Sequence, residues 1–515
     1  MALLRLPRSG GGAAAAAITS YLLRRLLCSP PPSVPPKRRY SLSTATLAAP
    51  FSPHLSSGDH LRHRPLLSDF DGELASGAEL RAALELISRT RGECSSREEA
   101  LGSLRDSGVE LAGHLIPVAI WQLREDWESA FLAFQWGRER LLSDCPRPWH
   151  LIIWVLAKNQ KFGIAWLLLR KMHRLHILTH LPFLILMEGY AAVNEPTKAI
   201  KTFRAMEKLG LAADSSSFYE LLRSLCKYRN VEEAEELLLS NRGVFPLKVE
   251  GFNIILDGWC SAMADLVEAK RCWREMAAFC ISPDGATYAL MIGCFSRAGN
   301  LFDSMRLYDE MKKKGWPPGI SVYNALIYAL AGEGLAATAK KLMKKMEELG
   351  LEVSVETYNS LILPLCEARK VDEAREMMEE MIQRGITPTA ETYKAFLRAE
   401  DMAGTMALLQ RMSGGAADGS VFLLLLEKFL RWEQAENALR IWAEMGKRGV
   451  EKEGGHYLAL VRGLVACGWK PKAMEFYREM KVRGFTADPK LERLFTEVEE
   501  RGRRGRRRAE RGKFD

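Results

Sequence analysis

The sequence lacks long apolar runs and paired cysteines. None of its apolar stretches approaches the ~18 residues that a membrane-spanning helix requires, although hydrophobic residues make up 47% of the 515-residue chain. The ten cysteines include no C-x-x-C pair, so neither a disulfide framework nor a zinc ribbon is indicated. We therefore expect a chain without a membrane partner in a reducing compartment, and we expect it to be monomeric.

Acidic residues are absent from the first 58 positions, which contain seven basic residues and many serines and alanines. This composition is typical of an organellar transit peptide, and arginines interrupt the one apolar stretch that could have been a secretory signal. Arg38-Arg39-Tyr40-Ser41 resembles a plant mitochondrial presequence cleavage site. We predict a mitochondrial transit peptide over 1–40, with the chloroplast as the alternative.

The net charge of +9 comes from the two ends of the chain. The first 58 residues contribute +7 and the arginine-rich segment 501–515 contributes +6, so the long middle carries −4. The overall charge is therefore not evidence that the body of the protein binds nucleic acid. We assign 490–515 as a basic C-terminal tail, which could bind RNA without sequence preference, dock on ribosomal RNA or keep the chain soluble.

Two segments near the N-terminus show weaker patterns. Residues 41–112 are polar, and we predict an irregular region there with one short helix near 79–88. Residues 113–145 contain "AFLAFQWG" and predict either a degenerate copy of the repeat described next or plain helices.

An aromatic residue recurs at intervals of 34 to 36 residues, apart from one interval of 29. The series is Trp149, Phe183, Phe218, Phe252, Tyr288, Tyr323, Tyr358, Tyr393, Phe422 and Tyr457. Apolar residues follow each aromatic at helical spacing, which predicts the buried face of a first helix. A period of this length indicates stacked supersecondary units rather than separate domains.

A second helix is predicted in each unit by a small residue and a methionine seven positions later, such as Ala374 and Met381. Seven residues are two helical turns, so both side chains lie on one face. A glycine such as Gly385 then ends the helix, because glycine accepts the left-handed geometry of a helix C-terminus. The sequence thus predicts an all-α solenoid of about ten stacked helical hairpins over 146–489, with a superhelical path.

The phrases "TYNSLI", "LCEARKVDEA" and "EEMIQRGITP" resemble the pentatricopeptide repeat (PPR) family, of the pure-repeat type found in plant organelles, rather than tetratricopeptide repeats. The resemblance covers 146–489. It implies single-stranded organellar RNA as the partner, read at about one base per repeat. The residue after the aromatic and the residue that closes the unit would together bond the Watson–Crick edge of a base.

Three such pairs match the family pattern. Asn253 with Asp284 resembles a uracil-preferring pair, Asn324 with Ser354 a cytosine-preferring pair, and Asn359 with Thr389 a loosely read pyrimidine pair. These six residues are the predicted base-reading set. The alternative is that the asparagines cap helix starts, which asparagine does well. Four other units carry leucine or alanine after the aromatic, Leu184, Ala289, Leu423 and Leu458, and Lys394 with Asp418 matches no family combination. Glu250, Glu356 and Glu391 stand where the family has an aliphatic residue that sandwiches the base.

Four basic residues each follow their aromatic by nine positions: Lys158, Lys227, Arg297 and Arg431. The resemblance places this position on the RNA-facing side, where each cation could neutralise a phosphate. The alternative is a solvated side chain stabilised by the helix dipole at a helix C-terminus.

We identify no catalytic constellation, metal site or cofactor. The nearest candidate is "HRLHILTH", but its three histidines, His173, His176 and His180, lie where one hairpin passes to the next, in a segment that we do not expect to be helical throughout. Nothing after Pro489 resembles the H-x-E and C-x-x-C deaminase extension of some plant PPR proteins. The chain is therefore predicted not to be an enzyme.

The resulting prediction is a mitochondrial RNA-binding solenoid that masks, remodels or presents a transcript. Group II intron splicing ranks first, ahead of transcript stabilisation and translation, and splicing factors would be further partners. The alternative is a protein-binding scaffold, such as a protein associated with the mitoribosome, because the middle of the chain is negative and most units lack a base-reading pair.

Overall fold

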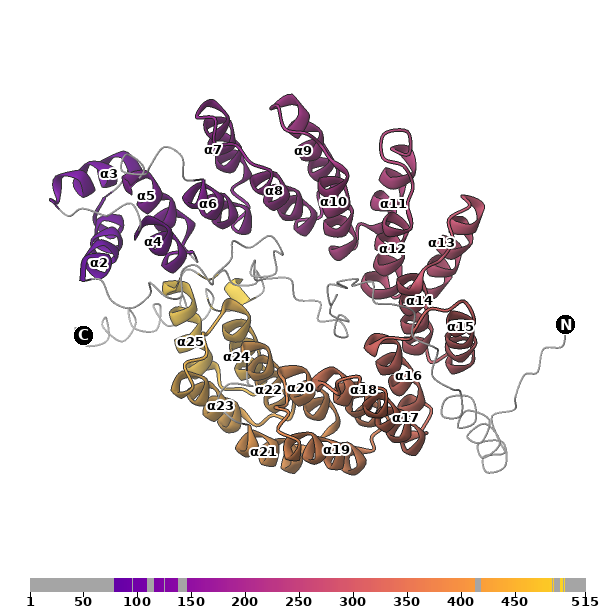
Figure 1. Ribbon diagram of the computed structural model, residues 1–515. Coiled ribbons are helices and arrows are strands. Elements are labelled where there is room, and N and C mark those ends of the chain that lie inside the picture. Colours follow the sequence, from indigo (N-terminus) through magenta and orange to yellow (C-terminus); the bar gives the residue numbers. More distant parts are fainter. Residues whose placement is uncertain are drawn as a thin grey trace. The chain divides into compact units, whose positions relative to one another are not determined.

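The computed structural model describes residues 78–94, 96–108, 115–124, 126–137, 146–412, 418–483, 485, 491–493 and 495. Every regular element in this part of the chain is helical (Figure 1). The predicted transit peptide, its cleavage site and the basic tail 501–515 lie outside the described residues. No described helix is long and apolar enough to cross a membrane.

The helices form two compact units, with the boundary inside α14 (Gly285–Arg297). The N-terminal unit contains α2 (Ala78–Glu93), α3 (Arg97–Asp106), α4 (Ile116–Gln122), α5 (Trp127–Gly137), α6 (Arg147–Lys158), α7 (Phe162–Arg174), α8 (Leu181–Ala192), α9 (Pro196–Lys208), α10 (Ser215–Lys227), α11 (Val231–Ser240), α12 (Val249–Asp257), the π-helical turn η5 (Gly258–Met263) and α13 (Leu266–Ala278). The C-terminal unit contains α15 (Leu301–Lys313), α16 (Ile320–Gly332), α17 (Ala336–Glu348), α18 (Val355–Glu367), α19 (Val371–Gln383), α20 (Ala390–Ala399), α21 (Met402–Arg411), α22 (Gly419–Arg431), α23 (Ala435–Lys447), α24 (Gly454–Ala466) and α25 (Lys470–Val482).

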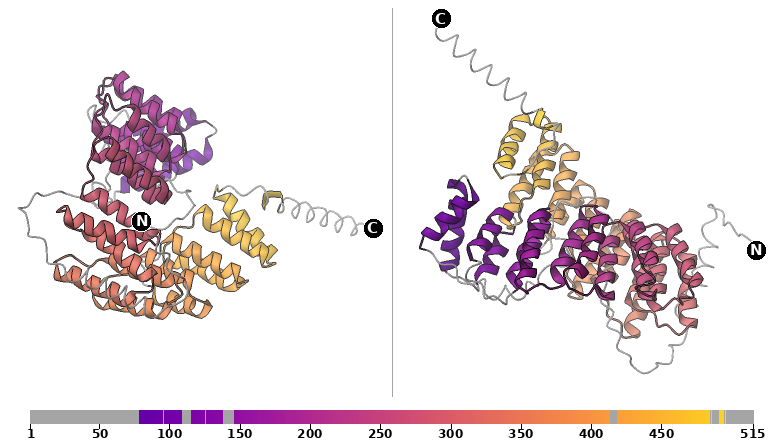
Figure 2. Two further views of the ribbon diagram at one scale, coloured as in Figure 1. Left: turned by 90° about the vertical axis from the view of Figure 1, so that its right-hand side faces the viewer. Right: turned by 90° about the horizontal axis from the view of Figure 1, so that it is seen from above.

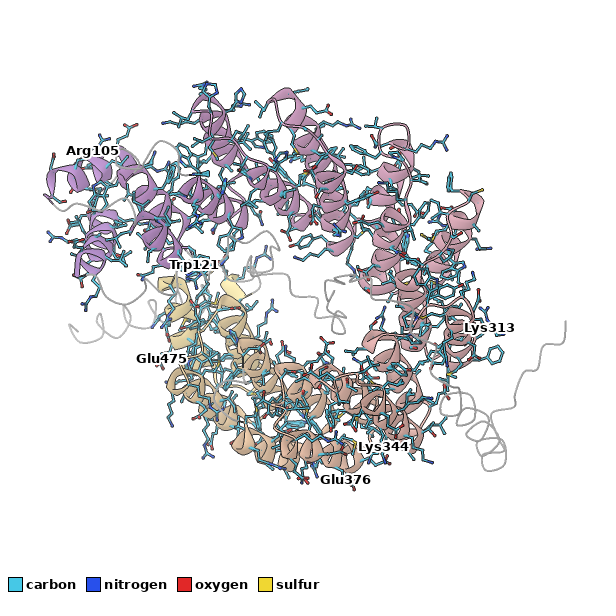
Figure 3. All side chains as sticks on the ribbon, viewed as in Figure 1. Arg105, Trp121, Lys313, Lys344, Glu376 and Glu475 are labelled. Carbon is cyan, nitrogen blue, oxygen red and sulfur yellow. The ribbon has the colours of Figure 1, made fainter. Side chains whose placement is uncertain are left out.

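The predicted solenoid of helical hairpins is confirmed in both units. From α6 onward the helices alternate between a first helix, which carries the recurring aromatic, and a second helix of the same hairpin. Within each of the two compact units, the first helices of successive hairpins pack on one another and form one side of the stack. The second helices form the other side (Figures 1 and 2). In the C-terminal unit, the second helices carry the exposed side chains Lys313, Lys344 and Glu376 along their outer edge (Figure 3).

The recurring residues form the core as predicted. All ten aromatics are buried, as are the alanines and methionines that mark the second helices. Some aromatics also bond across the hairpin: the Tyr358 hydroxyl donates to Glu380 Oε1 at 3.2 Å and the Tyr457 hydroxyl to Glu479 Oε1 at 2.6 Å. A tyrosine therefore links the two helices of its hairpin by a hydrogen bond in addition to filling the core.

Left-handed residues end the helices. Gly210, Gly315, Gly350, Gly385 and Gly449 all have positive φ after a second helix, as their positions predicted. The sequence did not reveal that a second left-handed residue ends most first helices, eleven positions after the aromatic. In the unit of Tyr358 this residue is Arg369, whose N–H donates to Cys366 O while the next N–H donates to Leu365 O. This turn satisfies carbonyls that the helix end would otherwise leave without partners.

The interval of 36 residues between Phe252 and Tyr288 has a structural explanation. Helix α12 continues into the π-helical turn η5, and the left-handed residue that follows, Ala264, comes twelve positions after the aromatic instead of eleven. A π-turn holds one more residue than an α-turn, so the extra residue is absorbed inside the first helix. The second helix of this unit, α13, again has the usual 13 residues.

The interval of 29 residues between Tyr393 and Phe422 corresponds to two shortened helices. Helices α20 and α21 have 10 residues each, whereas most helices of the neighbouring hairpins have 13. Helix α20 ends without a left-handed residue, and Glu400 follows in extended geometry. Asp401 then caps α21 by accepting a hydrogen bond from the Gly404 N–H.

Over 78–106 the chain is more regular than the predicted irregular region with one short helix near 79–88. The predicted short helix is part of the longer α2, and α3 follows it, capped by Ser96. Both helices pack on α5 and bury apolar side chains such as Ile87 and Leu104. Packing on α5 stabilises helices whose polar sequence alone is a weak signal. Within the predicted segment 113–145, the described residues form two short helices, α4 and α5, which pack on each other and on α6.

Candidate nucleic-acid interface

The residues that close the units are N-caps of the following first helix. Asp284 Oδ1 accepts a hydrogen bond from the Thr287 N–H at 2.9 Å, and the Thr287 hydroxyl accepts from the Asp284 N–H at 3.1 Å. Ser354 with Thr357, and Thr389 with Thr392, form the same reciprocal capping box. Capping holds each closing side chain in a fixed position at the start of its helix.

Two of the three predicted pairs are joined by hydrogen bonds. Asn253 Nδ2 donates to Asp284 Oδ1 at 3.1 Å, and Asn253 Oδ1 accepts from the Thr287 hydroxyl at 2.7 Å. Asn253 and Asp284 are both partly exposed. One N–H of the Asn253 amide and the second oxygen of Asp284 are not used in these bonds, so a donor and an acceptor lie together at the surface.

The pair of Asn359 and Thr389 has the same arrangement. Asn359 Nδ2 lies 3.5 Å from the Thr389 hydroxyl, and Asn359 Oδ1 accepts from the Thr392 hydroxyl at 2.7 Å. Each asparagine is the fifth residue of its helix and does not cap it. The alternative prediction, that these asparagines cap helix starts, is therefore wrong, because the closing residues perform that role.

The third pair is not joined. Asn324 is 1% exposed, and neither its Oδ1 nor its Nδ2 has a hydrogen-bond partner. Ser354 is engaged in the capping box with Thr357. A buried amide without partners is energetically costly, so this position differs physically from Asn253 and Asn359.

The threonines before the aromatics belong to this hydrogen-bonded arrangement, and the sequence reasoning missed them. Thr287 and Thr392 each bond both members of a predicted pair, the asparagine of one unit and the cap of the next. Their signal in the sequence was the recurring Thr-Tyr at 287–288, 357–358 and 392–393.

The three carboxylates that stand where the family has an aliphatic residue, Glu250, Glu356 and Glu391, lie in different environments. Glu250 Oε1 accepts from Arg223 at 2.8 Å, so its charge has a counter-ion on the preceding first helix. Burial raises the pKa of the Glu391 carboxyl above its ordinary value. Glu356 is exposed.

The four predicted phosphate-binding cations are each the last residue of a first helix: Lys158, Lys227, Arg297 and Arg431. Arg297 and Arg431 are exposed, and Lys158 is partly exposed. Lys227 donates to Glu188 Oε1 at 2.8 Å, and this carboxylate is 1% exposed. Because Lys227 neutralises a buried charge, a phosphate would have to compete with Glu188 for it.

The histidines of "HRLHILTH" do not come together. His173 lies in α7, His176 has φ of 58° and ends the helical path, and His180 lies at the start of α8, where its Nε2 is 3.2 Å from Ala212 O. Within the described ranges, no group of three or more His, Cys, Asp or Glu side chains could hold a metal ion.

Profiles of known repeats match several of the hairpins. The profile described as "PPR repeat family" matches residues 283–331, 318–367 and 353–399, and the profile described as "PPR repeat" matches 182–211 and 456–485. These segments contain Asp284 of the first predicted pair and both members of the other two pairs, Asn324 with Ser354 and Asn359 with Thr389.

Curated proteins of Arabidopsis thaliana match most of the chain. "Pentatricopeptide repeat-containing protein At1g80880, mitochondrial" is 52% identical over 454 residues, which cover 88% of this chain and 84% of that protein. "Pentatricopeptide repeat-containing protein At5g15010, mitochondrial" is 35% identical over 415 residues, which cover 79% of this chain and 72% of that protein. The mitochondrial localisation predicted from the N-terminal composition is confirmed by these relatives.

Among solved structures, the crystal structure of PPR10 from maize covers 82% of this chain at 21% identity, with a TM-score of 0.37. This chain spans 61% of the length of the maize chain.

Proposed function

Since the chain belongs to the pentatricopeptide repeat family, we propose that it binds a single-stranded mitochondrial RNA sequence-selectively and acts in RNA processing without catalysing a reaction. The observation that carries this proposal is the hydrogen-bonded set of Asn253, Asp284 and Thr287, which presents an unused donor and acceptor at the surface. An amide and a carboxylate together match the alternating acceptors and donors on the Watson–Crick edge of a base.

Read along the hairpins, the three pairs predict the preference 5′-U-N-C-Y. If each pair discriminates by ~1–3 kcal/mol, as bidentate base contacts do, the set supplies roughly 3–9 kcal/mol of selectivity. Asn324 and Asn359 are 1% and 6% exposed, so both must become more accessible to reach a base, whereas Asn253 is partly exposed already. We therefore assign the first position of this site to the pair already in place, Asn253 with Asp284. We assign the last position to Asn359 with Thr389, whose side chains are joined although Asn359 is buried.

Among the processing steps, we propose group II intron splicing first, with transcript stabilisation and translation as alternatives. The second candidate function is a protein-binding scaffold on the mitoribosome. It is favoured by Leu184, Leu423 and Leu458, which occupy the position after the aromatic and whose side chains cannot form hydrogen bonds.

The test is crosslinking and immunoprecipitation of the tagged protein from mitochondria, with sequencing of the bound RNA. Gradient sedimentation before and after ribonuclease treatment would accompany it. Enrichment of one intron or transcript end, in particles smaller than the ribosome, is the expected result. Co-sedimentation with a ribosomal subunit, with crosslinks only to ribosomal RNA, would establish the scaffold instead.

A further inference from the structure

The shortened hairpin of α20 and α21 borders a basic cavity. The cavity measures about 450 Å³ and lies among the ends of α18, α20 and α22, which pack on one another in the C-terminal unit (Figure 1). Its lining includes four cations, Arg369, Arg398, Lys428 and Arg431, together with Trp432. Only Arg431 of these residues was indicated by the repeat pattern.

The cavity exists because α20 is one turn short. Six positions after the aromatic, most units carry a small residue that faces the preceding first helix. At Gly463, for example, a Cβ atom would lie 2.5 Å from Leu430 Cδ1. Lys428 occupies this position in the unit of Phe422, and its long side chain fits because the last turn of α20 is missing.

Lys428 and Arg369 replace the missing helix end. Lys428 Nζ donates to Leu397 O, and to Glu400 O at 2.8 Å, while Arg369 Nη1 donates to Ala399 O at 2.7 Å. These carbonyls would otherwise lack the partners that a left-handed turn supplies. Both cations are thereby fixed in position, and each keeps donors that these bonds do not use.

The carboxylates of the lining do not cancel its charge. Glu400 is bound by Arg375, whose Nη2 lies 2.6 and 2.7 Å from the two carboxylate oxygens. Asp401 is engaged as the N-cap of α21. Arg398 and Arg431 are exposed and have no ion pair among the described residues. The cavity is therefore a concentration of positive charge with two arginines available to a ligand.

We propose that this cavity binds a phosphodiester of the RNA strand at the short hairpin, where the regular spacing of one base per unit is interrupted. The inference rests on the proposed function and deepens it. Arg398 and Arg431 bind the phosphate oxygens through their forked donors, and Lys428 and Arg369 set the positive field around them. Such a contact holds the strand without reading its sequence.

The experiment compares the full chain with Arg398→Gln/Arg431→Gln in binding a fluorescein-labelled pool of random 20-nucleotide RNA over a range of salt concentrations. The charge-matched control is Arg440→Gln/Lys447→Gln on α23, whose side chains are exposed on a second helix. Each phosphate contact to a single strand contributes about 0.7 to the slope of log affinity against log salt. We expect the cavity variant to lose about 0.7 or more of this slope and the control to keep it. Equal slopes for the cavity variant and the unmodified chain would overturn the proposal and leave RNA binding intact.

A second arm covers the case in which the unmodified chain binds no RNA, which would refute the proposed function. Thermal unfolding is then followed with inorganic pyrophosphate and with sodium chloride at equal ionic strength. A rise in the unfolding midpoint with pyrophosphate that the cavity variant lacks supports an anion site. The same midpoint change in both proteins rejects it.

Discussion

Asp284 and Ser354 occupy equivalent positions but carry different side chains, and each caps its helix together with a threonine three residues later. Ser354 therefore shows, within this same chain, how a serine would behave at position 284. Serine at 284 can keep the cap with Thr287, because Ser354 forms the same capping box with Thr357.

We expect Asp284→Ser to change the preference at the first position of 5′-U-N-C-Y from uracil to cytosine. The reason is that it converts the uracil-type pair with Asn253 into the pair present at Asn324 and Ser354. The difference between the binding free energies of the two RNAs should change by about 1–3 kcal/mol. The measurement is a titration with RNAs that differ only at that base. The control is Asp265→Ser, which alters the N-cap of the second helix α13. An unchanged preference in Asp284→Ser would refute the base-reading assignment.

His150 predicts a dependence of stability on pH. Burial lowers the pKa of its imidazole to about 4, and Thr179 Oγ1 lies 2.8 Å from its Nε2. In the unfolded chain a histidine takes up its proton near pH 6.5, so the unfolded state binds more protons between pH 6.5 and 4. Stability contributed by neutral His150 is present above pH 6.5 and is lost as the pH falls toward 4.

We expect the hairpin of α6 and α7 to lose about 2 kcal/mol of stability between pH 7 and pH 5, measured by hydrogen exchange of its amides. His150→Gln should remove most of this pH dependence, whereas His176→Gln, at an exposed position, should not. If both variants keep the full pH dependence, the effect belongs to another group.

At the scale of the helix, the two irregular intervals show how the stack accommodates insertions and deletions. One extra residue becomes the π-turn η5, and four residues lost between Tyr393 and α21 remove about one turn of α20. In both cases the apolar face of the first helix keeps its direction. The sequence revealed the intervals, but their structural form depends on contacts between hairpins, which periodicity does not report.

This reasoning predicts the effect of deleting single residues. Deleting Ser261 from η5 should restore the common interval of 35 and leave the thermal unfolding midpoint within a few degrees of the unmodified chain. Deleting Ala325 from the interior of α16 rotates the remaining buried residues of the helix by about 100° and should lower the midpoint strongly. A strong loss of stability in the Ser261 deletion would show that the π-turn is required rather than accommodated.

At the scale of the whole molecule, the sequence predicted the architecture well because one pattern is repeated many times. The aromatics, alanines, methionines and glycines are each a weak signal, and their recurrence at one period made them specific. The candidate site was less predictable. The asparagines and their partners lie 30 or 31 positions apart in the chain, and the sequence could not show that Asn324 is buried without a partner or that Lys227 neutralises Glu188.

The charge distribution also leads to a prediction at this scale. The segment 501–515 holds eight basic and two acidic residues, whereas 59–500 is negative. Deleting 501–515 should weaken binding of all RNA sequences equally and flatten the salt dependence of affinity, because cations without a base contact act only on phosphates. The measurement is the salt titration described for the cavity. Equal slopes with and without the segment would exclude its proposed role.

The Lys428 side chain occupies the space of the missing last turn of α20 and binds the carbonyls at its end. This contact matters for the engineering of such arrays, in which single repeats are swapped to change specificity. A full-length repeat grafted in place of Tyr393–Asp418 would press a regular helix turn against the Lys428 ammonium and remove the carbonyls that bind it. A regular repeat following the short one would leave those carbonyls bare. A designer would therefore have to graft the short hairpin together with the hairpin that carries Lys428, behind a hairpin that supplies Arg369.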